Sequence, residues 1–531
     1  MRKNLTLTIG LRYEYSTPKL DTDGRSFSVI PGLQSTVFPN APLGMVFPGD
    51  QGAPRGVNFP DKKNFGPRFG FAWDPWGDGK TSIRGGAGIF YDILKGEDNL
   101  QFNGQPPFFG AAGLFFNPVN PGQVGDVPYF ADPFGSAQVV NPFPSTPPPA
   151  NLDFVNAGVL PINAGGEVFL VNPHLHTPYI YQYNLSIQHE LAKTLIAEVN
   201  YVGNSSKGLT ALVDVNPFVL GTDTRVLNLT PQPNPEIAAF CAGDLGECPY
   251  ATLPEFQNVG FANYNSLEAS LTKQVGANKW GSQYFTFAYT YGKSIDTSSG
   301  FQNRNDQVPA YNIQQLRAVS DSDIKHRIVL SGGWDLPFDK TWESGPKRLT
   351  KGWSLYPIFS WRTGFPLDIP ARFPDRFDPT NPGPSGAGDP YLANALFAPG
   401  FTKVELLNPK HNDPANPGNF YFNPAGFDNN EADYATAPAN VALYGLPRNF
   451  FRGPGRTNFD LALAKTTSIT ERVAAEFRVE AFNIFNHAEF ANPDTNPNSG
   501  TFGQILTTGT SNSTTTDSDP RIIQLALRIT F

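Results

Sequence analysis

The sequence contains few cysteines, few charged residues and no long apolar run. Two Cys in 531 residues exclude a small scaffold held together by disulfides. Charged residues make up 16% of the chain, well below the roughly 25% of an ordinary soluble protein. No run of about 18 apolar residues occurs, which excludes membrane-spanning helices. The net charge of -8 opposes binding to phosphates, so we expect no nucleic-acid partner.

Aromatic residues, glycine and proline are abundant instead. The 44 Phe and 19 Tyr bring the aromatic content to 13%, which is too high for a disordered chain. The 51 Gly have no period of three, which excludes collagen. From residue 5 onward apolar and polar residues alternate, whereas a signal peptide would need a continuous apolar stretch. These features indicate a large β protein.

Twelve segments alternate between apolar and polar side chains, as strands with one apolar face do. In one of them, Tyr181, Tyr183 and Leu185 alternate with Gln182 and Asn184. Strands of soluble proteins usually run about 5–6 residues, whereas a tilted membrane strand needs about 9–11. Most of the segments have the greater length. The predicted strands are 5–15, 66–75, 81–91, 178–191, 195–203, 264–274, 282–294, 324–336, 353–363, 458–465, 473–485 and 521–531.

The connections between these segments alternate between long and short without exception. The long ones run roughly 29–94 residues and the short ones roughly 3–16. Outer-membrane barrels have this pattern, because tight turns lie at the periplasmic rim and large loops at the other. We therefore predict an all-β fold, a transmembrane antiparallel up-and-down β-barrel, with residues 1–531 forming one partial barrel domain. The predicted extracellular loops are 16–65, 92–177, 204–263, 295–323, 364–457 and 486–520.

Tryptophan placement supports the same interpretation. Amphipathic Trp rings prefer the headgroup level of a membrane, so a row of them at one rim predicts an aromatic girdle. Only Trp361 lies toward the other end of its predicted strand. The alternative is a soluble protein with Trp residues near turns. The six residues at short turns are Trp73, Trp76, Trp280, Trp334, Trp342 and Trp353.

Several segments together resemble a known family, although no single motif is strong. The chain is similar to the C-terminal part of a TonB-dependent outer-membrane receptor of the Oar-like kind. The order and spacing of the segments carry the resemblance, which extends from end to end of the chain. The segments are 64–92 (NFGPRFGFAWDPWGDGKTSIRGGAGIFYD), 263–274 (NYNSLEASLTKQ), 323–338 (DIKHRIVLSGGWDLPF), 352–369 (GWSLYPIFSWRTGFPLDI) and 476–487 (EFRVEAFNIFNH).

In the family that the chain resembles, a barrel of about 22 strands closes around an N-terminal plug. The plug carries a short segment that binds TonB. We expect this chain to be the C-terminal half of such a barrel, with about twelve strands and without the plug, the TonB-binding segment and the signal peptide. A count of strand directions agrees. If the last strand runs inward and leaves Phe531 in the periplasm, the first strand runs outward, as the eleventh of about 22 would.

The resemblance implies TonB-energised uptake of a large nutrient, such as a siderophore, oligosaccharide or peptide. The chain would be an integral protein of the cell outer membrane, in contact with its lipid. The last strand ends in Phe531 as in many outer-membrane barrels, which implies a signal for the barrel assembly machinery. A passive porin or a surface adhesin is the alternative function. A secreted soluble β protein is a third.

Cys241 and Cys248 lie in one predicted loop with six residues between them. In an oxidising compartment such a pair can close a small loop. Given a barrel in the outer membrane, we predict a disulfide between them. The alternative is two unpaired thiols in a reduced protein.

Two groups of side chains are candidates for ligand contact or for the inner wall. Aromatic residues at a pore mouth can stack on sugars or apolar groups, but they can equally pack the loop against its neighbours, which we favour. These are Phe102, Phe108, Phe109, Phe115 and Phe116.

Polar residues of the predicted strands would line the lumen, and we assign no ligand to them. These are Arg68, Arg84, Glu198, Glu268, Arg327, Glu476, Arg478, Glu480 and Arg528.

No pattern supports a metal, a cofactor or catalysis. His174 and His176 are only half of a metal site. The segments 21–24 and 321–323 resemble fragments of calcium loops, but neither continues to a closing Glu, so we expect solvated turns. No Gly-rich phosphate loop and no nucleophile with a partnering base can be identified. We therefore expect no cofactor and no enzyme activity.

Overall fold

The computed structural model describes residues 4–92, 105–108, 147–163, 168–217, 219, 224–278, 280–299, 316–370, 395–403, 420–428, 446–508 and 520–531. They form one large, mainly antiparallel sheet, two small two-stranded sheets and a few short helices. The fold is all-β, as the alternating segments predict. Within these ranges, no helix is long and apolar enough to cross a membrane.

Twelve strands follow one another along the main sheet in chain order. Each is antiparallel to the next, which confirms the predicted up-and-down arrangement. Each of the twelve overlaps one predicted segment. They are β1 (Leu5–Tyr13), β4 (Phe65–Trp73), β5 (Thr81–Tyr91), β7 (Tyr179–Ala192), β8 (Leu195–Asp214), β9 (Pro254–Asn278), β10 (Gly281–Asp296), β12 (His326–Leu336), β13 (Trp353–Arg362), β16 (Arg456–Ser468), β17 (Ala474–Phe482) and β18 (Ile522–Thr530).

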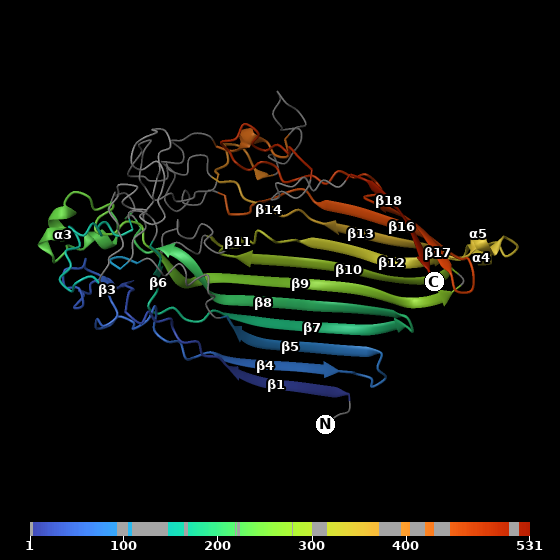
Figure 1. The fold of residues 1–531 in the computed structure, drawn as a ribbon, viewed down its shortest axis with the longest axis horizontal. Helices are drawn as coiled ribbons and strands as arrows, with labels where there is room; N and C mark the ends of the chain where they lie inside the picture. Colours follow the sequence, from blue (N-terminus) through green and yellow to red (C-terminus); the bar gives the residue numbers. More distant parts are fainter. Residues whose placement is uncertain are drawn as a thin grey trace.

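The short turns lie at one rim of the sheet and the long connections at the other (Figure 1). The largest of the short turns carries the one-turn helices α4 (Phe338–Thr341) and α5 (Lys347–Thr350). Two tryptophan side chains donate hydrogen bonds to the backbone within this short-turn rim. The Trp334 Nε1 donates to the Trp280 carbonyl oxygen at 2.7 Å, and the Trp353 Nε1 donates to the Leu349 carbonyl oxygen at 2.7 Å. The rim therefore has the aromatic composition that the sequence predicts.

Strands β8 and β9 are much longer than predicted, at 20 and 25 residues. Their hairpin extends beyond the rim, so the predicted loop 204–263 shrinks to residues 215–253. The pairing of β8 with β9 slips between Lys207 and Leu209 and again before Ala211. Gly208, with φ +62°, provides the left-handed backbone that such a bulge needs. Residues 204–208 (NSSKG) contain no apolar side chain, so the period-two pattern ends at residue 203 although the strand continues.

The main sheet is open. In the described part of the chain, β1 pairs only with β4 and β18 only with β17. Because the path contains twelve strands, an even number, the two free edges run in opposite directions. Unpaired edges of this kind promote pairing with other strands.

A small domain of packed connections, which we call the cap, covers the long-connection rim at its β8–β9 side (Figure 1). It consists of residues 14–64, 105–108, 147–163, 168–178, 215–217, 219 and 224–253. Its regular elements are β2 (Ser28–Val29) paired with β3 (Met45–Val46), β6 (Leu170–Val171) paired with β9, the 3-10 helix η1 (Leu227–Leu229) and α3 (Pro235–Phe240). Its core is aromatic and includes Phe27, Phe38, Phe47, Phe154, Ile162, Leu170, Ile237 and Tyr250.

Polar groups of the cap are bonded internally. Asp50 accepts hydrogen bonds from the Ser35 hydroxyl at 2.7 Å, the Thr36 hydroxyl at 2.8 Å and the Phe47 amide at 2.8 Å. Although partial burial opposes ionisation, these bonds lower the pKa of Asp50. The cap is thus a folded unit rather than a set of loose loops.

A second aromatic cluster joins the connection after β13 to the connection after β17. Its regular elements are β14 (Pro366–Leu367) paired with β15 (Phe451–Arg452), and the 3-10 helix η6 (Pro424–Gly426). One further short strand, β11 (Ala318–Val319), pairs with β10. The buried members of the cluster are Leu367, Ile369, Ala395, Phe422, Phe427, Phe451 and Phe502.

Candidate functional site

The strand register divides the main sheet into an apolar face and a polar face. On the apolar face Leu185 lies opposite Gly85 and Tyr201, and Tyr201 lies opposite Leu267. Leu185, Tyr201 and Leu267 are exposed to between 43% and 46%. An exposed apolar surface that continues across a whole sheet is typical of a membrane contact.

All nine polar residues expected in the lumen share the other face, because each occupies the alternate register position. Most of them have a close partner. Glu198 accepts from the Ser186 hydroxyl at 2.9 Å, and Arg84 donates to the Ser82 hydroxyl at 2.9 Å. Arg478 pairs with Glu480 at 2.8 Å. The polar face is therefore a wall of mostly paired polar groups.

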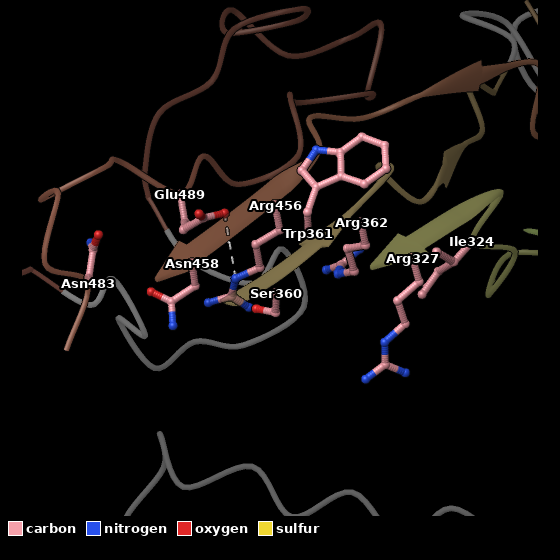
Figure 2. A pocket seen from close by; sticks show the side chains of 9 residues that line it. All are labelled: Ile324, Arg327, Ser360, Trp361, Arg362, Arg456, Asn458, Asn483 and Glu489. Atoms are coloured by element: carbon pink, nitrogen blue, oxygen red, sulfur yellow. Dashed lines mark ion pairs between the residues drawn. The ribbon is translucent and has the colours of Figure 1, made fainter. Parts of the chain in front are cut away.

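A pocket of about 370 Å³ interrupts this wall near the long-connection rim (Figure 2). Arg327, Arg362 and Arg456 line it, one from each of the neighbouring strands β12, β13 and β16. Glu489 supplies a carboxylate, and its Oε2 lies 3.7 Å from the Arg456 Nε. Asn458 also lines the pocket. The sequence interpretation includes only Arg327 among the three arginines, because the other two stand at strand ends, and one strand does not reveal what lies opposite it.

Ion pairs at the same rim hold the loop before β16 against the β10–β12 connection. Arg448 pairs with Asp296, and with Asp321 at 2.8 Å. Arg452 pairs with Asp323, which is almost fully buried. The sequence predicts a solvated turn at 321–323, and this is wrong for Asp323, because its partner comes from a segment more than a hundred residues away.

The cap contains a buried ion pair that no sequence pattern indicates. Arg225 and Asp214 are 1% and 2% exposed, and their Nη1 and Oδ2 atoms lie 3.3 Å apart. Arg225 also donates to the carbonyl oxygens of Gly246 at 2.7 Å and Asn216 at 2.8 Å. Asp214 ends β8, so the pair fastens the 215–253 connection to the sheet.

The structure joins Cys241 and Cys248 in a disulfide, with their Cα atoms 5.2 Å apart. Both are buried in the cap core, Cys241 directly after α3. Nearby, the Tyr250 hydroxyl donates to the Leu43 carbonyl oxygen at 3.0 Å, and burial raises the pKa of Tyr250 far above its usual range. The disulfide therefore closes a short turn inside a packed core.

Protein purified without reductant is expected to resist alkylation at Cys241 and Cys248 until it is unfolded and reduced, as read by intact mass. Replacing both residues by serine is expected to lower the stability of the cap by about 2 kcal/mol, because the unfolded loop gains freedom. Two thiols that alkylate freely in unfolded, unreduced protein would contradict the bridge.

The aromatic ligand candidates fall mostly outside the described residues, as Phe102, Phe109, Phe115 and Phe116 do. Phe108 is described. Its ring packs edge-on against Phe38 and Phe47, with centroids 6.0 Å and 5.9 Å away. Packing in the cap core accounts for this side chain, which agrees with the alternative that the sequence favours.

His174 and His176 contact neighbouring protein groups, and Phe531 is exposed to solvent. His174 stacks on Phe59 with ring centroids 5.1 Å apart, and the His176 amide donates to Asn258 Oδ1 at 2.7 Å. Where the structure describes the chain, no three His, Cys, Asp or Glu side chains gather as metal ligands would. Phe531 is 91% exposed directly after β18, so it is open to a binding partner.

Comparisons with known proteins agree with this architecture. A family model described as outer membrane beta barrel domain matches residues 1–524. No curated protein matches the chain.

Solved structures give weaker likenesses. The outer membrane transporter YddB from Escherichia coli is 11% identical, with a TM-score of 0.40 over 88% of this chain and 40% of that one. The ferripyoverdine receptor of Pseudomonas aeruginosa is 10% identical, with a TM-score of 0.35 over 90% and 34%. The siderophore receptor PiuA from Acinetobacter baumannii is 9% identical, with a TM-score of 0.35 over 88% and 36%. The chain thus spans 34–40% of the length of these three proteins.

The family match covers nearly the whole chain and agrees with the twelve antiparallel strands, the apolar outer face and the polar inner face. A soluble β protein, the third possibility that the sequence left open, is thereby excluded. The chain belongs to the outer membrane beta barrel domain family and is an integral β-barrel protein of the cell outer membrane.

Proposed function

We propose that the protein takes up a large nutrient across the outer membrane, with energy supplied through TonB. The observation that carries the proposal is the polar inner wall beneath long connections that all emerge at one rim (Figure 1). The sequence resemblance to Oar-like TonB-dependent receptors supports the same function. A siderophore, an oligosaccharide or a peptide is the class of nutrient that we expect.

The proposed partners follow from this role. TonB would act through a plug, and the wall described here would guide the ligand past it. The exposed Phe531 at the end of β18 would be the contact for the barrel assembly machinery. We propose no catalytic activity for the protein.

A second candidate function is passive. A porin would use the same polar wall without energy, and an adhesin would use the cap as a contact surface. The packed aromatic core of the cap is the observation that keeps the adhesin in consideration, because a folded domain offers a stable binding surface.

Depletion of nutrients from the medium distinguishes these functions. Three strains are compared: wild type, one lacking this gene and one lacking TonB. For energised uptake we expect at least one medium component to persist equally in both deletion strains, because both lose the same transport step. A porin would fail only in the strain lacking this gene. Unchanged depletion in both strains would contradict transport and favour the adhesin.

A further inference from the structure

Three arginines stand side by side across three strands of the polar face. Arg327 of β12 is the register partner of Arg362 of β13, and Arg362 is the register partner of Arg456 of β16. We call these three residues the arginine row. Directly opposed residues have Cβ atoms about 4.5–5.5 Å apart, so like charges at such positions repel and destabilise the sheet. Three arginines at successive opposed positions therefore destabilise the sheet, and the packing of their side chains does not explain why they are there.

Little negative charge balances the arginine row. Glu489 is the one carboxylate among the residues that line the pocket, and it is 7% exposed. Its Oε1 accepts from the Thr457 amide at 2.8 Å, and His487 Nδ1 lies 3.5 Å from the same oxygen. Asp460 lies close by, but it already accepts from the Asn458 side chain at 3.0 Å and the Asn483 amide at 2.8 Å. Three guanidinium groups therefore face a single lining carboxylate.

Two side chains of the row, those of Arg327 and Arg362, have few polar contacts. Arg362 lies over the Phe365 ring at 4.2 Å and donates weakly to the Thr363 carbonyl oxygen at 3.4 Å. Arg327 is exposed, and within the described residues its guanidinium has no hydrogen bond or ion pair. Elsewhere on the same face Arg478 and Arg84 each have a partner within 3 Å. Arg327 and Arg362 therefore have fewer close polar partners than these two arginines.

Figure 2 shows the guanidinium groups of Arg362 and Arg456 directed away from the side on which the Trp361 indole lies, with Ser360 and Asn458 beside them. The space of about 370 Å³ admits a compact polar group together with water. Guanidinium forks bind carboxylates and phosphates through paired, charge-assisted hydrogen bonds. Asn458 and Asn483 also line the pocket, and their side-chain amides donate to Asp460 at 3.0 Å and to the His487 carbonyl oxygen at 2.9 Å.

We propose that the arginine row binds a multiply charged oxyanion, a carboxylate or phosphate group carried by the transported ligand. This inference rests on the proposed transport function and narrows its substrate to an anionic class. A bound anion would offset the repulsion between the guanidinium groups. The three arginines would therefore destabilise the sheet when the pocket holds no anion, and bind the anion favourably when it enters. Sites at which a local rule is broken are where a binding role is expected.

Titration calorimetry tests the proposal on protein made from its complete gene and purified from outer membranes. The probes are citrate, inorganic phosphate and, as a neutral control, maltose. We expect citrate or phosphate to bind and maltose not to bind, with weaker binding at high salt. Arg327→Gln and Arg362→Gln are each expected to weaken anion binding at least tenfold. Arg362→Lys keeps the charge but loses the fork, so a smaller loss is expected.

Arg84→Gln is the matched control, because Arg84 lies on the same polar face in β5, far from the pocket in strand order. It should bind the anions as the wild type does. The row variants relieve repulsion, so they should fold at least as well, which heat-modifiable gel migration checks. Absence of anion binding in the wild type, as when another protein segment fills the pocket, would overturn the proposal. Equal binding by wild type and both row variants would also overturn it.

The binding result is separate from the test of transport. If anions bind through the arginine row but nutrient depletion does not depend on TonB, the site stands and energised uptake fails. If depletion depends on TonB but the row variants bind like the wild type, uptake stands and the anion site fails.

Discussion

Replacing Arg225 by methionine is expected to open the 215–253 connection of the cap at a cost of about 3–5 kcal/mol. The substitution removes the positive partner of Asp214 and leaves a carboxylate that is 2% exposed. It also removes the donors to the carbonyl oxygens of Gly246 and Asn216. Cleavage by thermolysin at increasing urea measures the opening, since the connection is cut only when it leaves the core.

Arg25→Met is the matched control for this experiment. Arg25 also pairs with an aspartate, Asp21, at 3.2 Å, but this pair lies at the surface. Water and salt screen such a pair, so its loss should leave the cleavage profile unchanged. If Arg225→Met were cleaved no faster than Arg25→Met, the buried pair would not fasten the cap to β8.

Replacing Leu185 by arginine is expected to destabilise the folded barrel by about 2–4 kcal/mol and to lower its amount in the outer membrane. Leu185 lies in the middle of β7 on the apolar face, and 44% of its surface is exposed. In the membrane that exposed surface contacts acyl chains, where a guanidinium is costly. Urea unfolding in lipid vesicles, followed by heat-modifiable migration, measures the loss.

Ser186→Arg provides the comparison at the next position along the chain. Ser186 points to the polar face, where its hydroxyl donates to Glu198. An arginine there meets a carboxylate and water rather than lipid, so only a small change in stability is expected. Similar losses at 185 and 186 would contradict the assignment of the two faces.

The sequence predicts all twelve strands of the main sheet because lipid and lumen impose opposite demands on successive residues. Most of the segment 178–191 alternates, so β7 matches its prediction to within a residue. The alternation of long and short connections then predicts the order of the strands and the rim at which each loop lies. These features are local, or depend only on distance along the chain.

Features that depend on contacts between distant segments could not be predicted in this way. The extension of β8 beyond residue 203 passes through a bulge at Gly208, where the period breaks. The pairing of Asp323 with Arg452 joins two loops. The arginine row exists only in the register of three strands, and Arg362 and Arg456 look like ordinary strand-end residues when each segment is considered by itself.

The cap is built from segments that lie far apart in the sequence, and this determines when it can finish folding. The hydrogen bond from Tyr250 to the Leu43 carbonyl oxygen closes a stretch of 207 residues, and Asn234 reaches back 194 residues to Asn40. Contacts of such sequence separation form slowly, because a long loop must close before they are gained. The first connection of the chain must therefore wait, with its phenylalanines exposed, until the β8–β9 hairpin has been synthesised. We expect the chain to be most prone to aggregation in this interval, because apolar surface is then exposed.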